Sequence, residues 1–354
     1  MTVADTMPRP ATVAAGDATG AAGAPPLLEV RGLVKHYEDA RGVTVRAVDG
    51  VDFTLRRGEV LGIVGESGCG KTTVGRTVMR LMDPTAGQIL LEGDDIAAKT
   101  GRGLKRARRD IQMVFQDPYG SLNPRHKVGT IVGEPLLVHG EPNRRERVRR
   151  LLELVGLPAA AVDRYPHEFS GGQRQRIAIA RALALDPKIV IADEPVSALD
   201  VSIQSQIINM IADLRRRLGL AMIFISHDLS VVRHVSDRIA VMYFGRIVEI
   251  APAEQLFSDP RHPYTRALLS AIPKPLKARD RGGRGRRIVL SGELPDPANP
   301  PQGCSFHGRC PETFDLCRRI APELLQVGEG RRAACHLVAD PEAAAGTPRG
   351  DGAG

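Results

Sequence analysis

Three short apolar runs rich in valine and isoleucine lie along the chain: VLGIVG at 60–65, KIVIAD at 188–193 and AMIFIS at 221–226. They are continuous rather than alternating, which predicts parallel strands covered on both faces of a sheet. Segments with the apolar spacing of a helix separate them, RERVRRLLELVG at 145–156 and RQRIAIARALAL at 174–185. Strands that alternate with helices predict an α/β fold.

The character of the sequence changes near residue 252. Prolines become frequent, RDRGGRGRR at 279–287 is typical of a flexible basic linker, and four of the five cysteines follow it. Both ends of the chain are rich in alanine and glycine, a composition typical of disorder. The predicted plan is a disordered arm at 1–26, a core domain at 27–252, a C-terminal extension at 253–338 and a disordered tail at 339–354.

The net charge of +8 arises mostly from arginine. It suits an anionic partner, whether nucleotide phosphates, nucleic acid or an acidic membrane surface, and does not choose among them. No uninterrupted apolar run reaches eighteen residues, and the first residues lack the basic front and the dense apolar stretch of a secretory signal. We therefore expect a cytosolic location, where disulfide bonds rarely persist.

The segment GESGCGKT at 65–72 follows a predicted strand and opens a helix, so it satisfies G-x-x-x-x-G-K-[ST] in the required context. Its glycines let backbone N–H groups close around phosphate oxygens, and the helix N-terminus adds a positive dipole end. Lys71 is expected to reach the terminal phosphates, and the Thr72 hydroxyl to hold Mg²⁺. The predicted nucleotide-binding residues of this loop are Gly65, Glu66, Ser67, Gly68, Cys69, Gly70, Lys71, Thr72 and Thr73.

Two further strands of the predicted sheet end in chemically active residues. KIVIAD ends at Asp193, which is expected to bind Mg²⁺ directly or through water. Glu194 follows it and is expected to orient or deprotonate the attacking water. His227 comes after AMIFIS, at the carboxyl end of a strand, where open α/β sheets bind their ligands.

The segment FSGGQRQRIAIARAL at 169–183 offers a second phosphate cradle. Ser170, Gly171, Gly172 and Gln173 stand at the start of a helix, where backbone N–H groups are free. One nucleotide needs only one cradle. Two cradles in one chain therefore suggest a head-to-tail pair, in which each chain's second cradle closes on its partner's nucleotide.

With these motifs in this order, residues 27–252 resemble the ATP-binding subunits of ABC transporters. The resemblance implies an α/β P-loop NTPase core with an inserted helical subdomain at about 117–185, which binds and hydrolyses ATP with Mg²⁺. It also implies that Gln116 belongs to the Q-loop, which senses Mg²⁺ and touches the membrane subunits.

The same resemblance assigns three other residues. Tyr37 lies where the family stacks an aromatic ring on adenine, although it also fits a partly buried loop tyrosine. Asp200, at the end of SALD, matches the loop that crosses between the paired ATPases. His227 matches the switch histidine that contacts the γ-phosphate.

The C-terminal extension narrows the resemblance. RHPYTRALLSAIP at 261–273, followed by PPQGCSFHGRCP at 300–311, is similar to the extension of ATPases that serve dipeptide and oligopeptide importers. This implies an energy-coupling subunit on the cytoplasmic face of the membrane, paired with a second, related and non-identical ATPase beneath two permease subunits. A solute-binding protein would act indirectly, and nucleic acid is not expected as a partner. Importers of nickel and other small solutes carry similar extensions, so the solute stays open.

The four clustered cysteines fit a metal centre. Four thiolates hold either tetrahedral Zn²⁺ or an iron–sulfur cluster, and the close C-x-x-C pairs favoured by structural zinc are absent. In the importer ATPases that this chain resembles, the same pattern holds a [4Fe–4S] cluster within a small cysteine-rich C-terminal domain. Zinc and free thiols stay open as alternatives. The predicted ligands are Cys304, Cys310, Cys317 and Cys335.

Two rival functions stay open at this point. A soluble ABC ATPase acting on nucleic acid or ribosomes is favoured slightly by the charge and the basic linker, but such proteins commonly carry two ABC units or a coiled-coil insertion. A redox sensor in the extension is the other, and it is compatible with transport. Because the predicted nucleotide motifs all precede residue 252, we expect ATP binding to survive loss of a metal from the extension.

Overall fold

The computed structural model describes residues 25–38, 42–272, 288–290, 292 and 294–339. The predicted basic linker at 279–287 lies outside these residues. So do the predicted N-terminal arm and C-terminal tail, except for residues 25, 26 and 339. Within the described part of the chain, no helix has the length and apolar character needed to cross a membrane.

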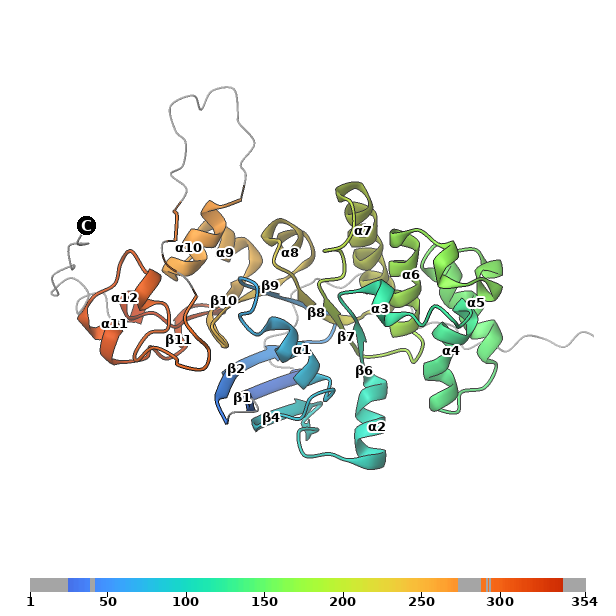
Figure 1. The fold of residues 1–354 in the computed structure, drawn as a ribbon, viewed down its shortest axis with the longest axis horizontal. Helices are drawn as coiled ribbons and strands as arrows, with labels where there is room; N and C mark the ends of the chain where they lie inside the picture. The colour runs from blue at the N-terminus through green and yellow to red at the C-terminus, as the bar shows by residue number, and fades with distance from the viewer. Residues whose placement is uncertain (1–24, 39–41, 273–287, 291, 293, 340–354) are drawn as a thin grey trace, which may run out of the picture.

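A central sheet of eight strands runs through the molecule in the order β11-β12-β10-β9-β3-β8-β7-β6 (Figure 1). The apolar runs of the sequence form β3, β7 and β8, which pair in parallel and are buried at every position, as predicted. The strands are β3 (Val60–Val64), β6 (Ile111–Val114), β7 (Ile189–Asp193), β8 (Ala221–Ile225), β9 (Arg238–Tyr243), β10 (Arg246–Pro252), β11 (Leu325–Gly328) and β12 (Arg331–Ala333).

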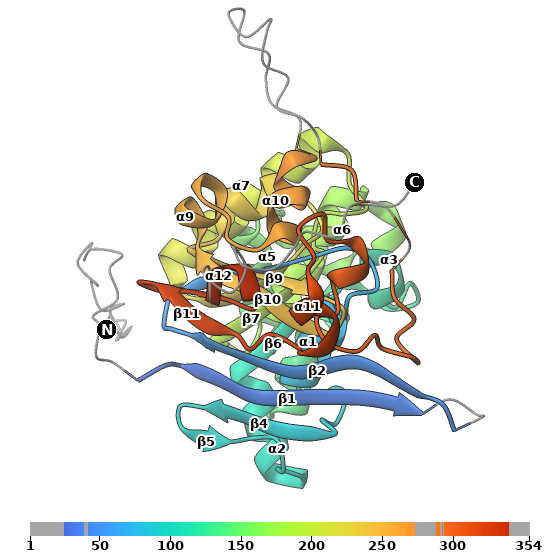
Figure 2. The ribbon, with the colours of Figure 1, turned by 90° about the vertical axis from the view of Figure 1, so that its left-hand side faces the viewer.

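A second, antiparallel sheet in the order β2-β1-β4-β5 lies along one side of the molecule (Figure 2). Helix α1 contacts both this sheet and strands β7 and β8. Apolar residues of both sheets and of α1, among them Phe53, Ile63 and Val74, form one continuous core cluster. The strands are β1 (Leu28–Glu38), β2 (Thr44–Leu55), β4 (Ala86–Leu91) and β5 (Asp94–Asp95).

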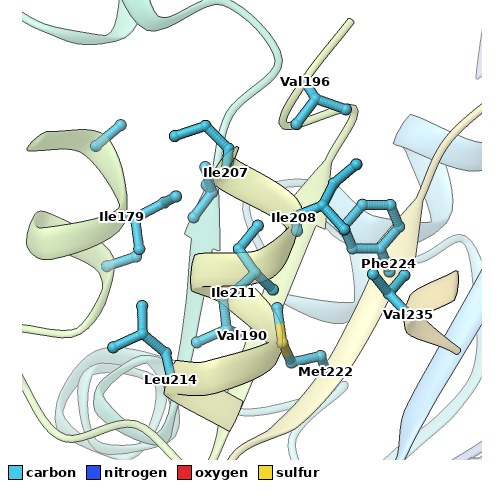
Figure 3. Packing of buried hydrophobic residues seen from close by; sticks show 14 of the residues in the cluster. Ile179, Val190, Val196, Ile207, Ile208, Ile211, Leu214, Met222, Phe224 and Val235 are labelled. Carbon is cyan, nitrogen blue, oxygen red and sulfur yellow. The ribbon is translucent and has the colours of Figure 1, made fainter. Parts of the chain in front are cut away.

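Helices cover the other face of the central sheet. Figure 3 shows α7 laid against it, with Ile208 and Ile211 of the helix beside Met222 and Phe224 of β8. The helices are α1 (Lys71–Val78), α2 (Gly101–Asp110), α3 (Pro118–Ser121), α4 (Val128–Val138), α5 (Arg144–Leu154), α6 (Gly171–Ala182), α7 (Val201–Leu218), α8 (Leu229–Val235), α9 (Ala253–Ser258), α10 (Pro263–Ser270), α11 (Asp315–Arg319) and α12 (His336–Ala339). Short 3-10 turns occupy Ala159–Asp163, Pro166–Glu168 and His307–Arg309.

Helices α4, α5 and α6 pack on one another at one end of the molecule (Figure 1). The helices predicted at 145–156 and 174–185 are α5 and α6. In α5, Val148, Leu151 and Leu152 are buried, as their spacing requires. Helix α6 begins at Gly171 with Ser170 as its cap, which agrees with the predicted position of residues 170–173 at the start of a helix.

The C-terminal region lies at the opposite end of the central sheet from α4–α6 (Figure 1). Strand β12 pairs with β10 and β11 pairs with β12, so the region continues the sheet of the core. The rings of Tyr243, Tyr264 and Phe306 pack edge to face, with centroids 4.7, 5.2 and 5.4 Å apart. Apolar packing and strand pairing therefore hold the extension to the core domain, and no cysteine-rich metal domain stands apart in the described chain.

Candidate nucleotide site

The order of the central strands brings the predicted motifs to one edge of the sheet. Strands β3, β8, β7 and β6 are neighbours and parallel. Their carboxyl ends lead into the loop at 65–70, His227, the Asp193–Glu194 pair and Gln116 in turn. Segments that are far apart in the sequence thus meet where open α/β sheets place their ligands.

The loop between β3 and α1 folds tightly around the Lys71 side chain. Its ammonium group is buried and donates hydrogen bonds to the carbonyl oxygens of Gly65 (2.8 Å) and Glu66 (2.9 Å). Gly70 has φ of 102°, and a Cβ there would lie 2.2 Å from the carbonyl oxygen of Ala47. Only glycine fits at that position. The ammonium group therefore already lies inside the loop, where it can exchange carbonyl partners for phosphate oxygens.

Asp193 and Thr72 form the part of the site that suits Mg²⁺. The Thr72 hydroxyl donates to Oδ1 of Asp193 at 2.9 Å, and Asp193 is fully buried. Its second oxygen, Oδ2, has no hydrogen-bond partner among the described residues, and burial raises the pKa of Asp193. A buried carboxylate oxygen without a partner, next to a hydroxyl, fits a hard cation that prefers oxygen ligands.

Glu194 lies between Gln116 and His227. Nε2 of Gln116 donates to one carboxylate oxygen at 3.1 Å, and Nδ1 of His227 lies 3.2 Å from the other. The Glu194 side chain is 14% exposed, and its backbone has φ of 46°, in the left-handed region that a glutamate seldom adopts. Strained backbone of this kind clusters at functional sites. The three side chains expected at neighbouring strand ends do come together.

The second cradle lies on a different element. The Ser170 hydroxyl caps α6 by accepting a hydrogen bond from the backbone N–H of Gln173 at 3.4 Å. In return, the side-chain oxygen Oε1 of Gln173 accepts a hydrogen bond from the backbone N–H of Ser170 at 3.0 Å. Gly171 and Gly172 open the helix between them. Figure 1 shows α6 beside α4 and α5 and apart from α1, which follows the phosphate loop. Both Ser170 and Gln173 are exposed, and so available to another chain.

The two remaining predicted residues, Tyr37 and Asp200, have no described contact with the residues at the strand ends. The Tyr37 hydroxyl donates to Sδ of Met82 at 3.0 Å, and the Lys35 ammonium group is 5.1 Å from the centre of its ring. Asp200 precedes α7 without capping it through its side chain. The adenine and dimer-loop roles of these residues stay predictions.

Two residues that the sequence analysis missed contact the phosphate loop from the C-terminal region. The guanidinium of Arg309 donates to both carboxylate oxygens of Glu66, at 2.8 and 3.2 Å. The Tyr264 hydroxyl accepts a hydrogen bond from the Glu66 amide at 3.0 Å. The only signal in the sequence was Glu66 itself, because an acidic side chain inside a phosphate loop needs a nearby cation to balance it. The predicted nucleotide motifs all precede residue 252, and these contacts connect one of them, the loop at 65–72, to the C-terminal region.

The four clustered cysteines line one small cavity, together with His262 and Phe306. All four thiols are free, and burial raises the pKa of Cys310 and Cys335 to about 12. The donor set has the chemistry of an iron–sulfur or zinc site. The described histidine, cysteine, aspartate and glutamate side chains nevertheless contain no group of three or more arranged to hold a metal ion.

Comparison with known proteins agrees with this geometry. Residues 48–197 match the ABC transporter family profile, and residues 248–317 match the C-terminal region of oligopeptide/dipeptide transporters. The oligopeptide transport ATP-binding protein AppF of Bacillus subtilis is 53% identical over 322 residues, which cover 88% of this chain and 97% of that protein. The dipeptide transport ATP-binding protein DppF of Escherichia coli is 51% identical over 325 residues, which cover 90% and 96%.

Solved structures give the same result for the fold. The dimeric, post-hydrolysis structure of the ATP-binding cassette MJ0796, bound to ADP and Pi, matches with a TM-score of 0.58 and 29% identity. The match covers 64% of this chain and 98% of that one. The chain therefore belongs to the ABC transporter ATP-binding proteins of the oligopeptide/dipeptide importer family, whose activity is ATP hydrolysis coupled to transport.

Proposed function

We propose that the chain drives import of dipeptides or oligopeptides by hydrolysing ATP at the carboxyl edge of β3, β8, β7 and β6. The observation that carries the proposal is the position of Glu194, held between Gln116 and His227 beside the buried pair of Asp193 and Thr72. A carboxylate fixed by two neighbours is suited to orient an attacking water and accept its proton.

Each side chain at the site would have a separate role in ATP hydrolysis. Lys71 would leave the carbonyl groups of its own loop and bind the β- and γ-phosphates, while Asp193 and Thr72 would hold Mg²⁺, which neutralises charge that develops on the phosphates. Glu194 takes a proton from the attacking water. The His227 side chain contacts Glu194 and is still 57% exposed, so it would remain accessible to the γ-phosphate.

Pairing of two ATPases would complete each site. The exposed cradle from Ser170 to Gln173 supports a role on the nucleotide of a partner chain, with Asp200 near the crossing between the two. We infer that the partner is a related, non-identical ATPase. The pair would lie under two permeases on the cytoplasmic face of the membrane, with residues 116–123 near the permeases. The proposed division is an ATPase domain at 27–252, with a helical subdomain at about 117–185 and an extension at 253–338.

Reconstitution tests the coupling. Proteoliposomes would contain this chain, a partner ATPase and two permeases, and would be given a solute-binding protein with or without peptide. We expect the peptide-loaded binding protein to stimulate Mg²⁺-dependent ATP hydrolysis, and Lys71→Ala to abolish the stimulation. Hydrolysis stimulated by nucleic acid or ribosomes, and indifferent to the loaded binding protein, would refute the importer function.

We also propose that Cys304, Cys310, Cys317 and Cys335 hold a [4Fe–4S] cluster, with Zn²⁺ as the alternative. Their shared cavity supports a common ligand, and high thiol pKa values imply that ligation requires loss of protons. Protein purified without oxygen should contain iron and acid-labile sulfide at about four of each per chain, as the cluster requires. One zinc per chain without iron would instead assign zinc, and a metal-free folded extension would reject both.

A further inference from the structure

Glu66 is the point where the C-terminal region meets the phosphate loop. Both oxygens of its carboxylate accept hydrogen bonds from Arg309, whose side chain is only 10% exposed. A two-pronged pair of this kind fixes the plane of the carboxylate as well as its distance. The Glu66 amide donates to the Tyr264 hydroxyl. Side chain and backbone of one loop residue are thus both held by residues that follow position 252.

The contact extends to the lysine of the loop. The carbonyl oxygen of Glu66 accepts a hydrogen bond from Lys71 Nζ at 2.9 Å, so a shift of Glu66 moves a partner of the ammonium group. The pairing of the Glu66 carboxylate with Arg309 should also favour nucleotide binding through its effect on charge. An unbalanced carboxylate in a phosphate cradle repels the polyphosphate that the cradle binds, and Arg309 cancels that charge.

The two anchors are themselves rigidly placed. Tyr264 is completely buried, and its ring packs against those of Tyr243 and Phe306. Arg309 lies three residues after Phe306 and directly before Cys310, one of the residues that line the cysteine cavity. Its guanidinium carbon is 6.0 Å from the centre of the Tyr243 ring. A side chain locked by packing can position its partner without a large loss of entropy.

We propose that Arg309 and Tyr264 are positioning residues for the phosphate loop, so that nucleotide affinity depends on a correctly folded C-terminal region. The proposal rests on the proposed function in one respect, that the loop at 65–72 binds the nucleotide. Neither residue touches the reacting atoms. Their effect passes through Glu66 and should therefore appear in affinity rather than in the chemical step.

The main test compares Arg309→Gln with Arg266→Gln in the full chain. Arg266 is the matched control, because it pairs with Glu312 at 2.8 Å within the same region and forms no described contact with the loop. Steady-state hydrolysis and equilibrium binding of Mg²⁺-ATP would be measured for both. Loss of a charged, partly buried hydrogen bond should raise KM and Kd about tenfold for Arg309→Gln, with kcat within about twofold of the parent. Arg266→Gln should match the parent.

Two further variants separate positioning from general damage. Glu66→Gln combined with Arg309→Gln should recover affinity to within about threefold of the parent, because the repulsive carboxylate is removed along with its cation. Tyr264→Phe keeps the ring and removes only the acceptor of the Glu66 amide, and should weaken binding about threefold. Should Arg309→Gln unfold, Arg309→Lys keeps the charge with a single contact and should raise KM by a smaller factor.

The outcomes distinguish this proposal from the proposed function. Parent affinity in folded Arg309→Gln, or a double variant no better than the single one, would overturn the positioning role. Parent affinity in Lys71→Ala would instead show that the nucleotide binds elsewhere, and would overturn the site itself.

Discussion

Asp193→Asn should separate what stabilises the empty protein from what binds Mg²⁺-ATP. In the structure, Oδ1 of Asp193 accepts the Thr72 hydroxyl and the fully buried Oδ2 has no partner among the described residues. Asparagine has the same shape and keeps the acceptor for Thr72. Its neutral amide replaces a charge whose burial is costly when no cation is present. The substitution should therefore stabilise the nucleotide-free protein.

The sign of this effect follows from the burial of Asp193. Burial raises this pKa above its ordinary value of 3.8, so the folded protein favours the protonated acid. This preference stabilises the folded protein fully at pH values below the pKa of Asp193 in the unfolded chain. The stabilisation is lost as the pH rises through the pKa of Asp193 in the folded protein. Near neutral pH, Asp193→Asn should therefore unfold at a higher Tm than the parent when no nucleotide is present. The gain should shrink toward acid pH.

With Mg²⁺-ATP present, the parent should instead be more stable than Asp193→Asn. A ligand present at one hundred times its Kd stabilises the parent by about 2.7 kcal/mol, and the variant lacks the Mg²⁺ ligand that supports this binding. Thermal unfolding of both proteins, with and without Mg²⁺-ATP, measures the crossing. Asp213→Asn on α7 is the control, since the ion pairs that Asp213 forms within the described chain are exposed. A variant less stable than the parent without nucleotide, or one stabilised equally by Mg²⁺-ATP, would refute the reasoning.

Two other substitutions test separate parts of the account. Gly70→Ala should lose nucleotide binding, and it should lower the free energy of unfolding by at least about 2 kcal/mol more than Gly68→Ala does. Both glycines have positive φ, but only at position 70 would a Cβ lie 2.2 Å from the Ala47 carbonyl oxygen. Denaturant titration of the pair checks this, and equal losses would contradict it. Ser170→Arg should fill one cradle and block the nucleotide site of the partner chain while the mutant's own loop still binds ATP. Mixed dimers of parent and variant would show the opposite pattern if the site were built within one chain.

Local signals carried the prediction of the site because its parts lie at strand ends. A continuous apolar run predicts a buried strand, and a residue at its end must lie at the edge of the sheet. Asp193, Glu194 and His227 could therefore be placed near the phosphate loop before any coordinates were known. Parallel pairing of β6 with β7 brings Gln116 to the same edge.

Contacts between distant segments could not be predicted in this way. Glu66 and Arg309 are 243 positions apart, and neither segment carries a pattern that names the other. Strands β11 and β12 are short and contain no apolar run, so nothing in their sequence indicates that they extend the central sheet. Tyr264 and Phe306 of the extension are almost completely buried in the core, and neither lies in an apolar run that would predict this burial.

Single-turnover hydrolysis by Glu194→Gln tests the central claim most directly. The amide can still accept from Gln116, so the fold and the binding of Mg²⁺-ATP should stay close to those of the parent. It cannot take a proton from water, so the rate should fall at least about 100-fold, the usual contribution of a general base. The account predicts tight binding of Mg²⁺-ATP with almost no turnover and accumulation of a closed dimer. Hydrolysis at the parent rate would contradict it.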